Sequence, residues 1–140
     1  LIYCGPGEEE YNRSLKPLLS TELQASVFDH IKTRSVRELV GLFAHCQLFV
    51  GNDTGPRHMA QAIDLPLLTI VAPGGDKIIA NPVNHPRYQA IDIFDAKGPA
   101  FQLPQNAEKD FIDDTLLRAI TPELVIARLT ALPDWQAATA

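Results

Sequence analysis

Two strand-like runs flank a short helical pattern in the middle of the chain, and this order constrains the fold most strongly. Residues 47–50 form a strand-like, mostly apolar run that ends at Gly51, and residues 56–63 have the length and composition of a short helix. Residues 67–71 form a second apolar run, bounded on one side by Pro66. Strands that alternate with helices pair in parallel and are covered on both faces. The order predicts an α/β fold with a Rossmann-like parallel sheet and helices on both faces.

The first third of the chain extends the same alternation. Residues 1–4 are apolar and lead into a Gly-Pro-Gly turn at residues 5–7, which predicts a buried strand followed by a tight turn. The acidic run Glu8-Glu9-Glu10 favours the start of a helix, because negative charge stabilises a helix N-terminus. Residues 27–31 predict another strand. A capping box begins at Ser35, and the apolar spacing that follows predicts a helix.

The second half of the chain is less regular. Residues 81–110 are rich in proline and only weakly periodic, which predicts long connecting segments with one candidate strand at 89–94. Residues 121–132 begin with Thr-Pro-Glu and have an amphipathic pattern typical of a terminal helix. We expect residues 1–140 to form one domain. The chain opens directly on a strand-like run, which suggests a fragment of a longer protein.

Composition excludes several classes of partner. The net charge of -5 over 140 residues provides no broad basic surface for a nucleic acid or an anionic bilayer. The longest apolar runs, such as residues 65–72, are much shorter than the roughly 20 residues of a membrane-spanning helix. Cys4 and Cys46 lie among apolar neighbours without metal-ligand spacing, which indicates reduced core cysteines in a cytoplasmic protein. Because the chain has no broad basic surface, a bound phosphate must be held by a local anion-binding site.

The segment between the first central strand and the next helix has the features of a local anion-binding site. A parallel sheet binds ligands beyond the carboxyl ends of its strands, and Asp53-Thr54-Gly55 lies at such an end. Gly55 permits close backbone approach, and Pro56 presets the first helical turn. Free backbone amides at a helix N-terminus bind anions. The amides expected to be free are those of Thr54, Gly55, Arg57 and His58. The alternative interpretation is that Asp53 or Thr54 only caps the helix.

Residues 49–60, with Leu65-Pro66 and Ala72-Pro73 after them, resemble the signature of the ADP-heptose:lipopolysaccharide heptosyltransferases around its D-T-G-x-x-H core. The resemblance covers roughly residues 1–75. It implies the C-terminal half of a GT-B fold, in which two Rossmann-like domains face a cleft and the C-terminal one holds the nucleotide sugar. It further implies ADP-heptose as the donor and the inner core of lipopolysaccharide as the acceptor, which is contacted through the other domain.

The resemblance also assigns roles to individual residues. It implies that Thr54 and Gly55 donate backbone hydrogen bonds to the ADP diphosphate, with His58 nearby, and that Asp53 approaches the transferred sugar. It suggests that Glu9 holds the ribose hydroxyls and that the main chain at Arg34 borders the adenine. The general base is expected on the N-terminal domain, so the isolated chain should be inactive. Neither a metal nor another cofactor is expected, and the location is cytoplasmic or peripheral at the inner membrane of a Gram-negative bacterium.

Three departures from the family pattern leave other functions open. Gly74-Gly75-Asp76-Lys77 stands where the family usually has an aromatic-Gly-Pro-Thr string, Arg34 stands where the family commonly has an apolar residue, and the region after Asn81 matches nothing recognisable. One alternative is a non-catalytic module that binds ADP or a nucleotide sugar. Another is a GT-B enzyme that uses a different nucleotide sugar, such as an epimerase or a transferase for UDP-sugars.

Overall fold

The computed structural model describes residues 1–5, 7–73, 75, 85–104, 114–133 and 135. These residues divide into two compact units, unit 1 from Leu1 to Glu38 and unit 2 from Leu39 to Ala140. Each unit is described by itself. No helix in the described part of the chain is long and apolar enough to cross a membrane.

Unit 1 consists of short helices and extended segments. It contains α1 (Glu9–Leu15), the 3-10 helix η1 (Lys16–Leu18) and α2 (Thr21–Ser26). The helix expected after the acidic run is therefore confirmed as α1. Ser20 caps α2, because its hydroxyl accepts a hydrogen bond from the Leu23 backbone N–H at 3.3 Å.

The prediction of two strands in unit 1 is wrong. Residues 1–4 and 27–31 are extended but are not strands, and the one backbone hydrogen bond between the two segments joins the Ile2 N–H to the Phe28 carbonyl at 2.9 Å. A strand requires a ladder of successive hydrogen bonds with a neighbour. The apolar pattern here marks extended backbone without specifying the pairing that would make it a sheet.

Helix α3 (Val36–Phe43) confirms the predicted capped helix. The Ser35 hydroxyl accepts from the Glu38 N–H at 3.2 Å, as the capping box requires. The Glu38 carboxylate turns back one residue further than expected and accepts from the Arg34 N–H at 2.6 Å. Leu39 and Phe43, one helical turn apart, are buried.

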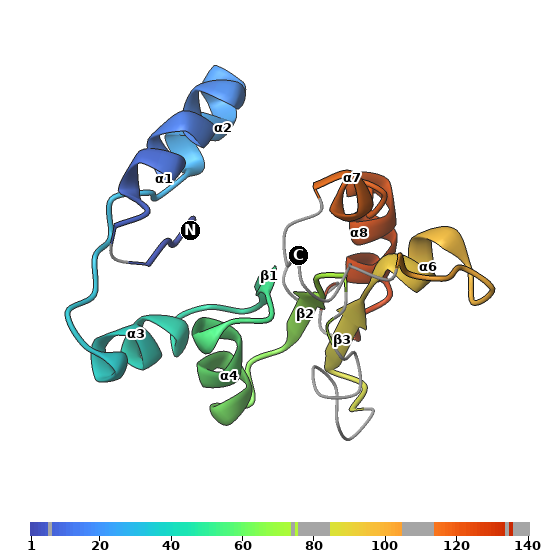
Figure 1. Cartoon of the computed structure of the whole chain (residues 1–140). Helices are drawn as coiled ribbons and strands as arrows, with labels where there is room; N and C mark the ends of the chain where they lie inside the picture. The colour runs from blue at the N-terminus through green and yellow to red at the C-terminus, as the bar shows by residue number, and fades with distance from the viewer. Residues whose placement is uncertain (6, 74, 76–84, 105–113, 134, 136–140) are drawn as a thin grey trace. The chain divides into compact units, whose positions relative to one another are not determined.

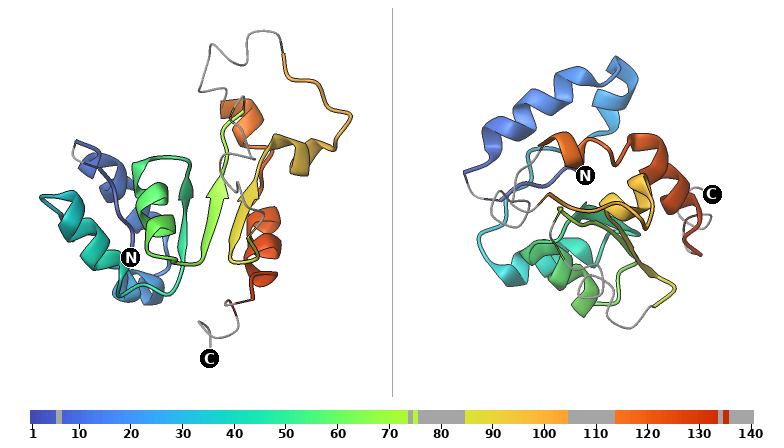
Figure 2. Two further views of the ribbon diagram at one scale, coloured as in Figure 1. Left: turned by 90° about the horizontal axis from the view of Figure 1, so that it is seen from below. Right: turned by 45° about the vertical axis from the view of Figure 1, so that its right-hand side comes forward.

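Unit 2 contains the predicted sheet, with three parallel strands in the order β1 (Phe49–Asn52), β2 (Leu67–Ile70) and β3 (Tyr88–Ile91). Helix α4 (Gly55–Ala62) connects β1 to β2 and lies on one face, while α8 (Pro122–Thr130) lies on the other (Figures 1 and 2). The strand–helix–strand order at the centre of the sequence is confirmed. The molecule is thus an α/β protein with a Rossmann-like parallel sheet and helices around it.

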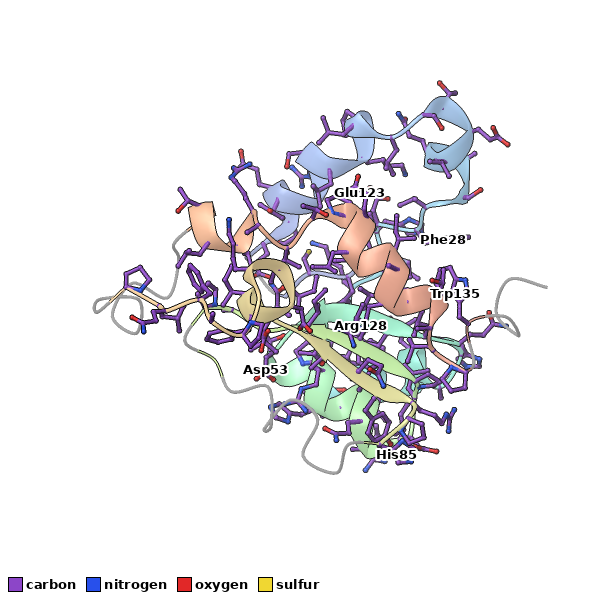
Figure 3. The ribbon with its side chains drawn as sticks, turned by 90° about the vertical axis from the view of Figure 1, so that its right-hand side faces the viewer. Phe28, Asp53, His85, Glu123, Arg128 and Trp135 are labelled. Carbon is purple, nitrogen blue, oxygen red and sulfur yellow. The ribbon has the colours of Figure 1, made fainter. Side chains whose placement is uncertain are left out.

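Buried apolar residues hold α8 against the sheet. Leu68 of β2 and Ile91 of β3 are fully buried and pack with Leu129 of α8. Trp135, labelled in Figure 3, packs against this cluster near the end of the described chain. The Thr121 hydroxyl caps α8 by accepting from the Leu124 N–H, so the terminal helix forms where the sequence indicates it.

The candidate strand at residues 89–94 is only half right, because β3 ends at Ile91 and a helix follows. Asp92 caps α6 (Ile93–Lys97), and its carboxylate accepts from the Phe94 and Asp95 N–H groups at 2.9 and 3.1 Å. Gly98, at φ 89°, ends α6. Helix α7 (Asp114–Leu117) follows before α8. Within the segment expected to be irregular, residues 81–84 and 105–110 lie outside the described residues.

Candidate functional site

The carboxyl end of β1 leads directly into α4 through two residues, Asp53 and Thr54. Thr54 has extended backbone, at φ -138° and ψ 177°, and occupies the N-cap position of α4. Neither its hydroxyl nor another side chain caps the helix. The interpretation that Asp53 or Thr54 only caps α4 is therefore wrong. Asp53, labelled in Figure 3, is held by a different contact.

Most of the amides expected to be free at this helix end are already used. The Thr54 N–H donates to the Asn52 carbonyl at 2.9 Å. The N–H groups of Arg57 and His58 both donate to the Thr54 carbonyl, at 3.0 and 3.4 Å. The first helical turn thus satisfies its own donors through the N-cap carbonyl. In the described structure, the Gly55 N–H is the amide of this set without an acceptor. One amide, rather than four, remains for an anion.

Arg57 forms the contact that holds Asp53, and the sequence interpretation gave it only a backbone role. Its side chain is completely buried, whereas that of Asp53 is 26% exposed. The Arg57 Nε and Nη2 atoms donate to the same Asp53 oxygen, Oδ1, at 2.9 and 2.7 Å. The Arg57 Nη1 atom donates to Gln61 Oε1 at 2.6 Å. The spacing of four residues from Asp53 to Arg57 and again to Gln61 is the sequence signal that could have revealed this cluster.

His58 lies beside the same guanidinium group. Its Nε2 atom is 3.1 Å from Arg57 Nη2 and 3.8 Å from Asp53 Oδ1. Its side chain is 59% exposed, so the Nε2 atom contacts Arg57 while the rest of the ring is accessible to a ligand. The structure brings Asp53, Thr54, Gly55 and His58 together within one turn at the start of α4.

Unit 1 contains a separate pocket of about 570 Å³, which falls in the size range of small-molecule sites. Glu9 and Arg34, the two residues assigned to the nucleoside, both line it. Tyr3 and Thr33 also line it, and their hydroxyl oxygens are 3.0 Å apart. Two segments far apart in the sequence therefore contribute to one concave surface within this unit.

Glu9 is held in its ionised form at the pocket. Its Oε1 atom accepts from Lys32 Nζ at 3.2 Å, and its Oε2 atom accepts from the Gly7 N–H at 3.1 Å. The pKa of Glu9 is lowered, first by a hydrogen bond from its own backbone amide and then by Lys32. An ionised carboxylate accepts hydrogen bonds from hydroxyl groups, which is the chemistry assigned to this residue.

The main chain at Arg34 is only partly available. Its N–H already donates to Glu38, whereas its carbonyl oxygen has no hydrogen-bond donor among the described residues. The Arg34 backbone can therefore accept a hydrogen bond from a ligand through its carbonyl oxygen, but its N–H is not available to donate one. Its side chain and that of Arg13 line the pocket, and neither has an ion-pair partner in the described part of the chain.

Asp29 is a further pocket residue that the sequence analysis did not identify. Lys16 Nζ donates to its Oδ1 atom at 3.0 Å, and this hydrogen bond is the main reason that the pKa of Asp29 is lowered. Neither the sequence spacing nor a motif links these two residues, because they are brought together only by the turn through η1 and α2.

Part of the loop that departs from the family pattern is described. The Gly75 N–H donates to the Ala72 carbonyl at 2.8 Å, and a Cβ atom at Gly75 would lie 2.7 Å from Val71 Cγ1. Glycine is therefore required for this tight turn. Gly74, Asp76 and Lys77 lie outside the described residues.

Comparison with protein families gives a match over residues 4–105 to glycosyltransferase family 9, the heptosyltransferases. The chain belongs to this family. No curated protein and no solved structure matches it. The matched region includes every residue assigned to the donor, from Glu9 to His58, and ends before α7 and α8. The resemblance found in the sequence is confirmed, and the family indicates a glycosyltransferase, whose partners are a nucleotide sugar and an acceptor. The three-stranded parallel sheet is consistent with a fragment of a GT-B enzyme of this family.

Proposed function

We propose that the chain binds ADP-heptose for transfer of the heptose to the inner core of lipopolysaccharide. The observation that carries this proposal is the placement of the D-T-G-x-x-H residues, which lie together where β1 ends and α4 begins, inside the region matched to the heptosyltransferases. The six residues assigned to the donor are Asp53, Thr54, Gly55, His58, Glu9 and Arg34.

The start of α4 supplies the contacts proposed for the diphosphate and the sugar. The free Gly55 N–H points from a helix N-terminus, where the helix dipole also favours negative charge. His58 provides a second hydrogen bond, Asp53 approaches the sugar, and the Thr54 backbone shapes the turn. These contacts favour departure of the diphosphate, because it gains charge as its bond to the sugar breaks.

The acceptor hydroxyl must lose a proton as its oxygen bonds to the sugar carbon. The resemblance assigns the general base that takes this proton to the N-terminal domain of the enzyme. We therefore propose that the chain alone binds the donor without completing transfer.

Unit 1 supplies the contacts proposed for the nucleoside. The ionised Glu9 carboxylate is suited to accept hydrogen bonds from the ribose hydroxyls. The unpaired Arg34 carbonyl is suited to accept one from an exocyclic amino group, which adenine carries. A pocket of about 570 Å³ provides the space for a nucleoside.

Calorimetry with ADP tests the phosphate site through two glycine variants. A Cβ atom at Gly55 would meet no atom nearer than Met59 Cε at 4.0 Å, so Gly55→Val blocks ligand approach without a clash inside the protein. Gly41→Val is the matched control, because a Cβ atom at Gly41 also meets nothing within 4 Å. We expect Gly55→Val to weaken ADP binding by about tenfold, or about 1.4 kcal/mol, and Gly41→Val to leave it unchanged. Equal affinity in all three proteins would exclude the proposed phosphate site.

The same experiment with EDTA tests whether binding needs a metal ion. Within the described residues, no group of three or more His, Cys, Asp or Glu side chains could hold one. The proposed contacts to the diphosphate come from protein hydrogen-bond donors, so we expect the affinity for ADP to be the same with and without EDTA. A strict requirement for a divalent ion would contradict these contacts.

Arg34 favours one alternative donor. Its guanidinium group lines the pocket without an ion-pair partner among the described residues, and guanidinium groups form paired hydrogen bonds with guanine. This arrangement supports a different nucleotide sugar as the alternative substrate. Calorimetry with UDP and GDP beside ADP distinguishes the two, because the adenosine proposal requires ADP to bind most tightly.

A further inference from the structure

The buried guanidinium group of Arg57 contacts two of the residues assigned to the donor. We propose that Arg57 is a positioning residue, which fixes the Asp53 carboxylate through one oxygen and holds His58 in the tautomer with its proton on Nδ1. The contacts stand on their own, and only their consequence for sugar transfer rests on the proposed function.

The two hydrogen bonds to Asp53 divide the roles of its oxygens. Arg57 Nε and Nη2 both donate to Oδ1, at 2.9 and 2.7 Å, and no described residue donates to Oδ2. Gln61 holds the other side of the guanidinium group through its contact with Nη1 at 2.6 Å. Because Arg57 is fully buried and fixed at both sides, the Asp53 carboxylate has a defined orientation. Oδ2 is the oxygen left for a ligand hydroxyl.

The contact with His58 fixes the position of a proton. A guanidinium group donates hydrogen bonds and cannot accept them. His58 Nε2, at 3.1 Å from Arg57 Nη2, must therefore be the acceptor, and a proton on Nε2 would place two N–H groups against each other. In the neutral imidazole the other nitrogen then carries the proton.

The two fixed side chains leave one acceptor and one donor for the ligand. Asp53 offers Oδ2, and His58 offers its Nδ1–H, which has no partner among the described residues. An acceptor beside a donor suits a sugar hydroxyl next to a phosphate oxygen. Donors that are oriented before the reaction stabilise a leaving group without reorganisation in the transition state. Arg57 acts on this pair through orientation and need not touch the ligand.

Nitrogen-15 NMR of the imidazole rings tests the inference in the chain as it stands. The His58 signals are assigned by their loss in His58→Gln. We expect the wild-type protein, above the pH at which the ring is protonated, to carry its proton on Nδ1. Arg57→Met should shift the ring toward the Nε2–H tautomer that free imidazole prefers. Arg128→Met is the matched control, because Arg128 Nη2 makes an equally short contact with Asp95, at 2.9 Å, elsewhere in the unit. This control should leave His58 unchanged.

A wild-type His58 with its proton on Nε2 would overturn the inference, even if Arg57→Met does not fold. An unchanged tautomer in folded Arg57→Met would also overturn it. Steady-state transfer kinetics of the complete glycosyltransferase add a functional measurement with Arg57→Lys, which keeps the charge but loses the planar fork. We expect kcat to fall by about tenfold or more while KM changes less than about twofold. An Nδ1–H tautomer that depends on Arg57, in a protein that does not bind ADP, would support the positioning role and reject the proposed donor. ADP binding together with an Nε2–H tautomer would support the proposed donor and reject the positioning role.

Discussion

At the scale of single residues, Asp53 shows what a motif reveals and what it hides. The sequence places this carboxylate at a strand end and offers two roles, a helix cap or a sugar contact. The structure rejects the cap and adds a third role, the partner of a buried arginine. The motif could not show this, because burial of Arg57 depends on how α4 packs on the sheet. The turn and the first turn of α4 use three of the four amides that looked free in the sequence.

Asp53 variants should therefore change stability, in contrast to the small effect expected of a cap. Asp53→Ala leaves the buried guanidinium group without its charged partner, so we expect a loss of about 3 kcal/mol in the free energy of unfolding. Asp53→Asn keeps an oxygen acceptor and should lose about 1 to 2 kcal/mol. Urea denaturation measures both. Arg57→Met combined with Asp53→Ala should recover part of the loss, since no buried charge remains. Wild-type stability in Asp53→Ala would show that the ion pair is not formed.

Thr69 is a buried polar residue on β2 that the proposed function does not use. Its side chain is fully buried, and its Oγ1 atom has no hydrogen-bond partner in the described structure. A buried hydroxyl without a partner is destabilising. We expect Thr69→Val to raise the free energy of unfolding by about 1 kcal/mol, measured by urea denaturation. Thr69→Ser is the control, because it keeps the hydroxyl and should lower stability by deleting a methyl group. A less stable Thr69→Val protein would show that the hydroxyl is satisfied.

At the scale of elements, the sequence was most successful where local signals were complete. The strand–helix–strand run through α4, the capped helix α3 and the terminal helix α8 all form as predicted. The expected strands at residues 1–4 and 27–31 do not form, because strand pairing depends on partners distant in sequence. Helix α6 was missed because an apolar run continues from β3 into it, and only the capping of Asp92 separates the two.

A contact between Asp64 and Tyr88 joins the turn after α4 to the start of β3 and should make stability depend on pH. The Tyr88 hydroxyl donates to Asp64, and this hydrogen bond is the main reason that the pKa of Asp64 is lowered and that of Tyr88 raised. The carboxylate contribution is present above the ordinary aspartate pKa of about 4 and is lost as pH falls through the lowered value. The phenol contribution is present below about pH 10 and is lost as pH rises through the raised value.

Removing the Tyr88 hydroxyl tests this contact. In Tyr88→Phe we expect the pKa of Asp64 to rise toward its ordinary value, as followed by NMR titration of the carboxyl carbon. Acid unfolding should also begin at a higher pH. Tyr11→Phe is the matched control, because Tyr11 is 70% exposed and its hydroxyl has no hydrogen-bond partner in the described structure. Identical Asp64 titration curves in the wild-type and Tyr88→Phe proteins would rule the contact out.

At the scale of the whole molecule, the two units differ in how they are stabilised. The fully buried side chains, including Leu67, Leu68 and Ile91, all lie in unit 2, and no described residue of unit 1 is buried. Buried apolar area is the main source of folding free energy. The pocket assigned to the nucleoside therefore belongs to the unit with the smaller intrinsic stability. The sequence analysis did not predict this division, because burial depends on contacts between residues distant in sequence.

Amide hydrogen exchange measures this difference and tests the donor at the same time. In the free protein we expect the slowest exchange in β2 and β3, and faster exchange throughout unit 1, because regions with few buried contacts open at lower free energy. A ligand stabilises the states that bind it, so saturating ADP should slow exchange at residues 29–34, which line the pocket. UDP at the same concentration is the control and should slow exchange at these residues less.

Equal protection of the two units without a ligand would contradict the stability difference. Slowing by ADP confined to unit 2 would instead reject the pocket of unit 1 as the nucleoside site.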